Sequence, residues 1–505
     1  MSTSVLLNFP RVCLSVMCAI VACLGLTGCV DLKVYRSALP GPAGPQPCAA
    51  VSALSSPGVA DCADQSSETN AQYTMHVVEF DDEGWPFDGA NGQVQIDSAI
   101  DQIKGQLKGT SDCVRLFVYV HGWRHNASTT DSNVVNFRAF LGQVAAATTA
   151  ASSAGKDVCE DPAIAARGAT QKPGGSASVV RKPRPAAVKT VGIYVGWRGL
   201  SVIDVRPLVY ASFWDRKNTA DRVAQGSVRE LFGRLNALAR YAPASGKRLT
   251  APSQTQAQLR TYVIGHSFGA SVAFRALSQS LIDSFSEDID ADPEGEPTSI
   301  SRFVDMVVLV NPAIEAARFD PVFRAAKKLR TTCLTRQPND PLCDRPIYQA
   351  PVLAVFTSEG DLATKRAFPV GASLSNLFER TLGPAQRQSI VQTIGWDENY
   401  QTHRLSIPVR CEPSQADPFD PSEATPRYRP PGWAWCFLAG TGPMLLTHLG
   451  ATPRAAEEGI VYNGPIWNVR VPKTIMSDHN DTWNDSFRGL LLYLFTNERQ
   501  FRSTI

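Results

Sequence analysis

The sequence predicts an α/β protein organised around a mostly parallel, doubly wound sheet. From about residue 72 onward, short apolar segments of strand length alternate with longer segments of helical periodicity, and this alternation is typical of parallel sheets covered by helices. Polar or glycine-containing motifs directly follow several apolar segments, as expected where strands end at the ligand-binding edge of such a sheet. The third observation is the stretch 261–277, TYVIGHSFGASVAFRAL, which has the pattern of a strand, a sharp turn and a helix.

Hydrophobic patterning predicts the elements in order. Apolar or alternating runs of strand length cover residues 72–80, 115–120, 191–197, 262–264, 306–310, 352–356 and 461–471. Helical spacing covers residues 96–107, 134–147, 213–241, the part of 261–277 after the turn, and 487–495. We expect loops at residues 165–189, which are rich in glycine, proline and basic side chains, and at the acidic stretch 288–296.

The first 28 residues have the pattern of an export signal. Arg11 precedes an apolar run over residues 12–26 that is too short for a comfortable membrane span. The run ends in LTGC, which resembles the lipobox of bacterial lipoproteins, and this resemblance implies cleavage before Cys29 and lipidation of that residue. Val30 stands where lipoproteins retained at the inner membrane often carry Asp, so we expect an anchor in the outer membrane, facing the periplasm. An uncleaved membrane anchor is the alternative.

Residues 29–70 are expected to join this anchor to a body that spans residues 71–505. The joining stretch is rich in Pro, Gly, Ala and Ser, contains PGPAGP and has no hydrophobic period. These properties predict a flexible tether.

Cysteine usage indicates an oxidising compartment. Eight cysteines remain beyond Cys29, namely Cys48, Cys62, Cys113, Cys159, Cys333, Cys343, Cys411 and Cys436. An even number in an exported chain favours disulfides, and we expect four bridges paired in sequence order. A metal site is not indicated, because the sequence has no C-x-x-C and no cysteine pair accompanied by a spaced histidine pair.

The overall charge balance argues against a nucleic-acid partner. Lys and Arg number 49 against 47 Asp and Glu, whereas binders of nucleic acid need an excess of basic side chains. The one basic run, residues 181–184, lies in the loop expected at 165–189. No motif in the chain predicts a cofactor.

The motif Gly265-His266-Ser267-Phe268-Gly269 predicts a nucleophile elbow. A serine hydroxyl is a weak nucleophile, so it must project from a sharp turn to where a histidine can take its proton. Glycines suit both flanks, because the neighbouring backbones approach too closely there for a Cβ atom.

With these motifs the chain resembles the α/β-hydrolase superfamily from about Val114 to the C-terminus, and within it a group of bacterial exported hydrolases. The motifs that carry the resemblance are VYVHGWRHNA, VGWRGLS, SFWDRKNTADR, VIGHSFGAS, TSEGDLAT and SDHNDTW. The resemblance implies an α/β-hydrolase fold with an eight-stranded sheet and a triad in the order nucleophile, acid, histidine. The chain departs in length, since 118 positions separate Asp361 from His479 (479 minus 361). We therefore expect a cap or side lobe at about residues 371–450.

Chain order selects the histidine. Only His403, His448 and His479 follow Ser267. His479 lies in SDHNDTW, a polar turn between a late strand and the last helix, which suits an exposed general base. His403, in YQTHRL, is the second candidate.

The acid has three candidates. Asp361 and Glu359 follow the strand at 352–356, and Glu315 follows the strand at 306–310. Asp361 matches the acid position of the resembling family, and its short side chain suits a fixed hydrogen bond to an imidazole.

Two backbone N–H groups are expected to form an oxyanion hole. In the resembling family, one donor follows the strand that ends at His121-Gly122, here Trp123, and the other follows the nucleophile, here Phe268. A tight turn with a packed tryptophan is the simpler interpretation of the first motif. Trp197, Trp214 and Asp215 recur in family-like stretches, and we expect packing or ion-pair roles for Trp214 and Asp215.

Together these features predict a membrane-anchored serine hydrolase that cleaves carboxylic esters, either small molecules or lipids, without a cofactor or metal. An acyltransferase would use the same residues and a different acceptor. A catalytically idle scaffold in the cell envelope is the alternative from another class, although a fold alone would not require Ser267, Asp361 and His479.

Overall fold

The structure is a computed structural model. It describes residues 30–40, 64–88, 94–107, 113–153, 188–201, 208–240, 258–287, 304–335, 351–376, 378–408, 434–439, 442–449 and 465–496. Across these ranges, no helix is both long enough and apolar enough to cross a membrane.

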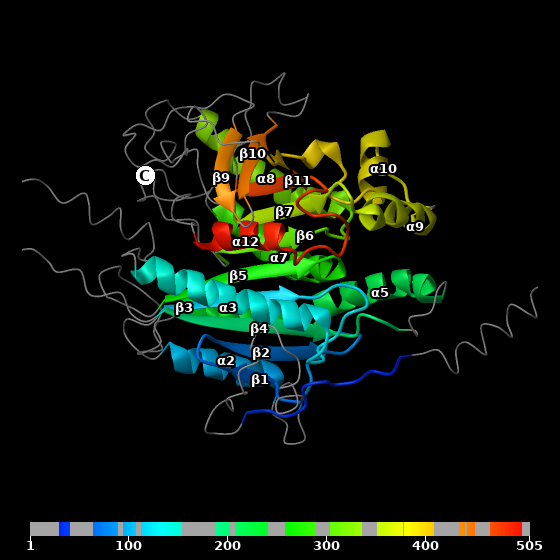
Figure 1. Cartoon of the computed structure of the whole chain (residues 1–505). Helices are drawn as coiled ribbons and strands as arrows, with labels where there is room; N and C mark the ends of the chain where they lie inside the picture. Colours follow the sequence, from blue (N-terminus) through cyan, green and yellow to red (C-terminus); the bar gives the residue numbers. More distant parts are fainter. Residues whose placement is uncertain are drawn as a thin grey trace, which may run out of the picture.

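A single mixed sheet runs through the described part of the chain and contains eleven strands (Figure 1). In spatial order they are β1 (Ser67–Thr69), β2 (Tyr73–Phe80), β4 (Val188–Trp197), β3 (Cys113–Val120), β5 (Gln258–His266), β6 (Met306–Val310), β7 (Leu353–Ser358), β11 (Ile466–Val471), β8 (His403–Ser406), β10 (Gly442–His448) and β9 (Ala434–Ala439). Neighbours from β2 to β8 pair in parallel, whereas β1, β10 and β9 pair antiparallel at the two edges. The predicted α/β class with a mostly parallel sheet is confirmed.

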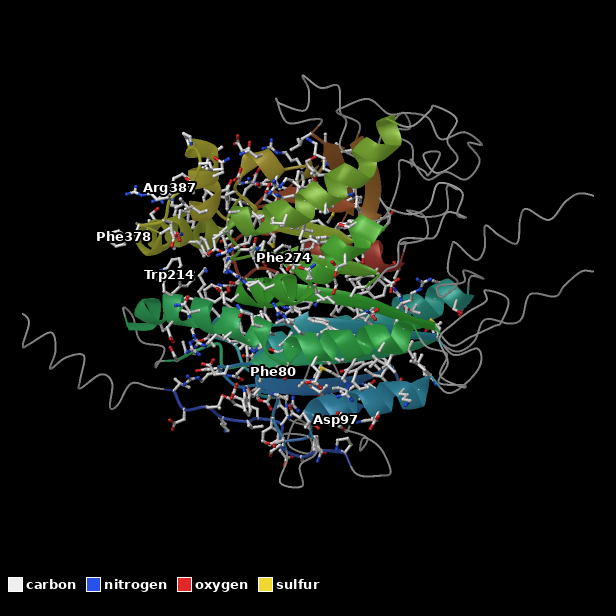
Figure 2. The ribbon with its side chains drawn as sticks, turned by 180° about the vertical axis from the view of Figure 1, so that it is seen from behind. Phe80, Asp97, Trp214, Phe274, Phe378 and Arg387 are labelled. Carbon is white, nitrogen blue, oxygen red and sulfur yellow. The ribbon has the colours of Figure 1, made fainter. Side chains whose placement is uncertain are left out.

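Helices cover both faces of the sheet. One face carries α2 (Gln95–Gln106), α5 (Leu208–Gln225), α6 (Val228–Arg240), α7 (Phe268–Glu287) and α8 (Ala316–Thr335). The other carries α3 (Ser132–Ser153) and α12 (Asp485–Thr496), which lie in front of the sheet in Figure 1. Figure 2 shows the molecule from behind, with the helix that carries Phe274, α7, on the side that faces the reader.

Strand β3 shows why the sheet needs helices on both faces. Val114, Leu116 and Val118 belong to the core under α2 and α5–α8, whereas Phe117 and Tyr119 belong to the core under α3 and α12. Side chains alternate between the faces of a strand, so a strand that is apolar at every position must be covered twice.

Arg115 is the exception in β3 and ties the chain's last helix to this sheet. Its guanidinium is buried and donates to Thr148 Oγ1 at 2.7 Å and to the Phe495 carbonyl at 2.6 Å. It also lies over the rings of Phe117 and Tyr262. Hydrogen bonds offset part of the cost of burying a charge, and one of them here satisfies a carbonyl in the last turn of α12. Arg115 Nε is buried without a hydrogen-bond partner among the described residues.

The segment expected as a cap or side lobe, residues 371–450, contributes strands to the main sheet in its described part. Its described part includes most of α9 (Phe368–Ser375), all of α10 (Pro384–Val391) and the three strands β8, β9 and β10. The strands extend the main sheet, because β8 pairs in parallel with β11 and then carries the antiparallel β10–β9 pair. Pairing satisfies backbone groups that an open edge at β11 would leave exposed.

Part of the stretch expected as a tether also differs, because it packs on the body. The backbone N–H groups of Tyr35 and Arg36 donate to the carboxylate of Glu79 at 2.8–3.1 Å. The Arg36 side chain is fully buried and donates to the Ala127 carbonyl at 2.9 Å. Further along, residues 67–69 form β1. Isolated polar contacts of this kind hold the segment without any hydrophobic period.

One of the expected disulfides involves a described side chain. Cys113, the first residue of β3, is disulfide-bonded. Its partner and the side chains of the other seven cysteines lie outside the described residues, so pairing in sequence order stays a prediction.

Helix α7 leaves no room for a side chain at Gly269. A Cβ atom there would overlap the carbonyl oxygens of Val120 and His121, which belong to or follow β3. We expect Gly269→Ala to destabilise the protein by about 2 kcal/mol, because backbone atoms cannot yield as a flexible side chain can. Gly233→Ala in α6 is the matched control: a Cβ meets nothing within 4 Å there, and the gain in helix propensity should stabilise by roughly 0.5–1 kcal/mol. Denaturant midpoints of the two variants would contradict this if they shifted alike.

Candidate active site

Ser267 occupies a strained turn between β5 and α7. Its φ angle is +56°, a left-handed conformation that costs a residue with a side chain roughly 1–2 kcal/mol. The turn is held on both sides, since Ser267 N donates to the Val310 carbonyl at 3.0 Å and the Ser267 carbonyl accepts from Ala313 N at 3.2 Å. The predicted strand–turn–helix pattern of the elbow is therefore present, with the serine side chain at the carboxyl edge of the sheet.

Three predicted site residues lie together at this edge. The Ser267 hydroxyl is 2.8 Å from His479 Nε2, and His479 Nδ1 is 2.9 Å from Asp361 Oδ1. They come from the turn after β5, the end of β7 and the loop between β11 and α12. The carboxyl ends of parallel strands share one edge of the sheet. His479 is therefore a neighbour of Ser267, from which it is separated by 212 positions, and of Asp361, from which it is separated by 118.

Asp361 is fully buried and ionised. Thr364 donates to it from its backbone N at 3.0 Å and from its hydroxyl at 2.5 Å. Burial alone would raise the pKa of Asp361, but the His479 imidazole and the Thr364 donors outweigh it and lower the pKa below the ordinary value. A carboxylate can only accept hydrogen bonds, so His479 carries its hydrogen on Nδ1, and Nε2 is left to accept from Ser267.

The loop that carries His479 is fixed through its backbone. The His479 carbonyl accepts from His266 Nε2 at 2.8 Å and from Asn311 Nδ2 at 2.9 Å. Ser358 donates its hydroxyl to the Met476 carbonyl at 2.5 Å. Three strand ends, those of β5, β6 and β7, therefore hold one loop in place. The sequence prediction missed Asn311 and Ser358.

His266 must be neutral to do this. Burial and the adjacent His479 lower the pKa of His266 to about 3. With Nε2–H donating to the His479 carbonyl, the ring adds no positive charge beside an imidazole that has to accept a proton.

The loop after β3 lies against the serine. A Cβ at Gly122 would come within 3.0 Å of Ser267 Cβ and of the His266 carbonyl, so Trp123 follows a glycine whose backbone lies against Ser267. His121 fixes this loop: Trp197 N donates to its Nε2 at 3.0 Å, Trp197 Nε1 donates to its carbonyl at 2.9 Å, and the two rings stack. Burial lowers the pKa of His121 to about 4, which keeps the ring neutral as an acceptor.

Phe268, the other predicted oxyanion position, is the first residue of α7. The first N–H groups of a helix have no partner within the helix, and the helix dipole favours negative charge there. The Phe268 ring is fully buried and packs on Phe213 with ring centroids 4.8 Å apart, so only its backbone is positioned to act.

The competing candidates have other partners. Glu315 forms ion pairs with Lys217 at 2.7 Å and with Arg275 at 3.4 Å, and Glu359 is half-exposed near Arg404. His403 is buried in β8, where it bonds to the Thr402 hydroxyl at 2.8 Å. The His448 side chain lies outside the described part of the structure.

Trp214 and Asp215 lie on α5. Trp214 packs against Phe368 with ring centroids 5.6 Å apart, and a Cβ at Gly371 would overlap its ring. Asp215 forms an ion pair with Arg216 at 2.6 Å. These contacts agree with packing and ion-pair roles.

No protein-family model, curated protein or solved structure matches the chain. Within the described ranges, no group of three or more histidine, cysteine or acidic side chains is arranged to hold a metal ion. In this site a hydroxyl is hydrogen-bonded to an imidazole nitrogen, and the imidazole is hydrogen-bonded to a buried carboxylate. Such an arrangement can activate a serine for attack on an acyl carbon.

Proposed function

We propose that this chain is a serine hydrolase of the α/β-hydrolase type that cleaves carboxylic esters through an acyl-enzyme on Ser267. The observation that carries the proposal is the unbroken hydrogen-bonded series Ser267–His479–Asp361, with distances of 2.8 and 2.9 Å. The chain order nucleophile, acid, histidine and the elbow at φ +56° support it.

In the proposed reaction, Ser267 Oγ attacks the acyl carbon while His479 Nε2 takes its proton. The N–H groups of Trp123 and Phe268 stabilise the negative oxygen of the tetrahedral intermediate. As the intermediate collapses, the alkoxide leaves and takes the proton from Nε2. Water then attacks the acyl-enzyme, with His479 again accepting the proton, and the acid product and free Ser267 result. Asp361 stabilises the imidazolium formed in each half.

Two alternatives remain distinct from this proposal. An acyltransferase would pass the acyl group from Ser267 to an acceptor other than water. An idle scaffold would have no use for the strained Ser267 turn or for the four hydrogen bonds that hold Asp361 and the His479 carbonyl, because strain and buried polar networks cost free energy.

Labelling with a fluorophosphonate tests the nucleophile. We expect the probe to modify Ser267 and Ser267→Ala to lose both labelling and ester hydrolysis by several orders of magnitude, because the covalent route disappears. Ser271→Ala is the matched control, since Ser271 is a buried serine one turn further along α7 and should leave labelling intact. An unlabelled wild-type protein would favour the scaffold, and turnover only with an added acceptor would favour a transferase.

Exchange of the acid tests the role of Asp361. Asp361→Asn should keep the fold but lower kcat by about 10⁴-fold, because an amide at this position favours the wrong tautomer of His479. Glu315→Gln should lower kcat far less, since Glu315 pairs with Lys217 and Arg275. If Asp361→Asn kept its activity while Glu315→Gln lost it, the acid would be Glu315.

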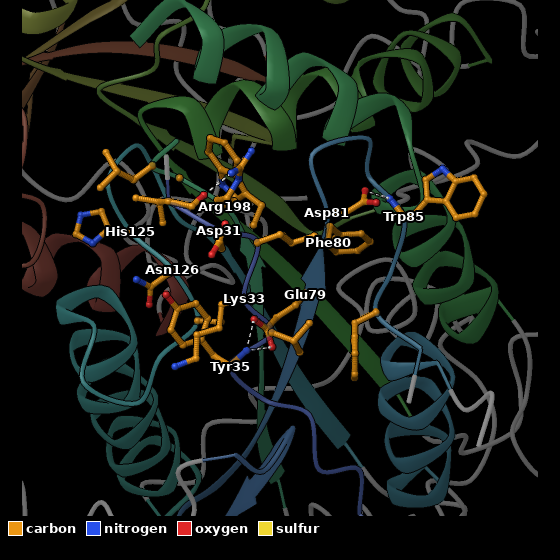
Figure 3. Close-up of a pocket in the computed structure, with 18 of the residues that line it drawn as sticks. Asp31, Lys33, Tyr35, Glu79, Phe80, Asp81, Trp85, His125, Asn126 and Arg198 are labelled. Carbon is orange, nitrogen blue, oxygen red and sulfur yellow. Dashed lines mark hydrogen bonds between the residues drawn. The ribbon is translucent and has the colours of Figure 1, made fainter. Parts of the chain in front are cut away.

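We further propose that Cys29 carries a lipid anchor that holds the protein in the outer membrane. The next residue is already attached to the body: Val30 N donates to the Ser201 carbonyl at 2.9 Å, and Arg198 donates to the Val30 carbonyl at 2.5 Å. Figure 3 shows the segment around Asp31, Lys33 and Tyr35 along a pocket of about 310 Å³. A lipid on Cys29 would then keep this face close to the bilayer.

Cell fractionation tests the anchor. Cys29→Ala should move the protein from the membrane fraction to the soluble periplasmic fraction, because the thiol that accepts the lipid is gone. Unchanged membrane fractionation of Cys29→Ala would contradict the anchor and favour an uncleaved N-terminal segment.

A further inference from the structure

A second pocket, of about 510 Å³, borders the proposed catalytic residues. It lies between the loop after β3, the first turns of α3 and the segment that follows His479. Its lining includes Trp123, which is a proposed oxyanion-hole residue. It also includes His266, which precedes Ser267, and Asn480, which follows His479. A ligand in this pocket would therefore be next to the reacting atoms.

The lining of this pocket is polar and its formal charges balance. Asn136, Asn480 and Asn484 contribute amides, Arg124 is the one guanidinium, and Asp481 is the one carboxylate. An amide side chain both donates and accepts hydrogen bonds, as a hydroxyl group does. An alkyl chain in such a pocket would leave these groups without partners, at a cost of roughly 1–3 kcal/mol for each buried one.

The inner wall of the pocket is fixed in advance. Asn133 Oδ1 accepts from the Tyr119 hydroxyl at 3.1 Å and from Trp483 Nε1 at 3.0 Å. Asn484 holds the start of α12 by accepting from Phe487 N at 2.9 Å. A preformed site loses less entropy when it binds a ligand.

The buried polar atoms of this wall include the donor Asn133 Nδ2 and His266 Nδ1, which have no hydrogen-bond partner among the described residues. His266 Nδ1 is an acceptor because the ring's hydrogen is on Nε2, which donates to the His479 carbonyl. Both side chains are at least nine-tenths buried. Neighbouring atoms enclose both of these atoms, so the groups that a hydroxylated ligand would reach are the at least partly exposed amides of Asn136, Asn480 and Asn484.

The position of the pocket indicates which half of the ester it takes. Asn480, Asp481 and Asn484 belong to the segment directly after His479. In the proposed reaction His479 Nε2 protonates the departing oxygen, so the alcohol must lie on the His479 side of the acyl carbon. Since three of its lining residues follow His479 closely in the chain, the pocket adjoins the loop that carries this proposed base.

We propose that this pocket binds the alcohol part of the ester and that this alcohol is an uncharged polyhydroxylated molecule, a sugar. The inference rests on the proposed ester hydrolysis and narrows it to esters of carbohydrates. The indole rings of Trp123 and Trp483 in the same lining supply flat apolar surfaces against the carbon skeleton of such a ligand.

The test compares two kinds of acetate that share the acyl group and differ in the alcohol. The acetylated methyl glycosides of a hexose and a pentose serve as polar substrates, and hexyl acetate serves as the apolar one. We expect kcat/KM to be at least tenfold higher for a glycoside acetate. Asn136→Leu, which keeps the volume and removes the amide, should lower the ratio of the two kcat/KM values by tenfold or more, since sites built for hydroxyl groups discriminate strongly. Asn218→Leu, an exposed asparagine on α5 outside the pocket, should leave that ratio unchanged.

A preference for hexyl acetate, or an equal loss on both substrates in Asn136→Leu, would overturn the inference while leaving ester hydrolysis in place. If neither acetate is cleaved, the proposed function fails, and the pocket is then tested alone. Tryptophan fluorescence of Ser267→Ala would be titrated with the acetylated glycosides. Saturable quenching that Asn136→Leu weakens would sustain the pocket's specificity, and no binding would contradict it.

Discussion

The close approach of α7 to strands β3 and β5 is the constraint on which the rest of the structure depends. Gly265 and Gly269 have no side chains, so the first turn of the helix can sit directly on the strand ends. Only with this contact can Ser267 be held at φ +56°, in a turn that a relaxed chain would avoid. The turn is stable because β6 supplies a carbonyl at Val310 and the following loop an N–H at Ala313. Backbone strain at Ser267 is thus offset by hydrogen bonds to the neighbouring backbone.

A second consequence of that packing is the neutral state of His266. Residues next to the elbow are buried by α7 and by the His479 loop, and burial keeps the His266 ring uncharged. A charged ring 5.2 Å from His479 would oppose protonation of the proposed base. His266 therefore has two effects on His479. Its Nε2–H holds the His479 backbone, and its lack of charge leaves the His479 side chain free to take a proton.

The sequence sufficed to predict the sheet where patterns are strong and local. Residues 306–310 form β6 with the predicted bounds, and the elbow stretch forms β5 and α7. The edge strands β9 and β10 were missed, although two apolar runs separated by Gly440-Thr441 are a hairpin signal. Asn311 was missed because an amide has no titratable group to single it out in a sequence, and here it donates to a backbone carbonyl. The contact of Arg36 with Glu68 and Ala127 had no sequence signal, since it joins isolated residues far apart in the chain.

The long spacing between Asp361 and His479 has a physical explanation in the segment that separates them. Trp396, from this segment, donates its indole N–H to the Thr364 hydroxyl at 3.0 Å, and Thr364 donates in turn to Asp361. The indole ring is held between the cations of Lys365 and Arg470, 4.3 and 3.9 Å from its centroid. Each such contact contributes stabilisation when it is desolvated. The inserted segment therefore extends the edge of the sheet and also fixes the second partner of the buried carboxylate. Its length can vary without moving Asp361, provided that Trp396 and the strand that carries Arg470 keep their places.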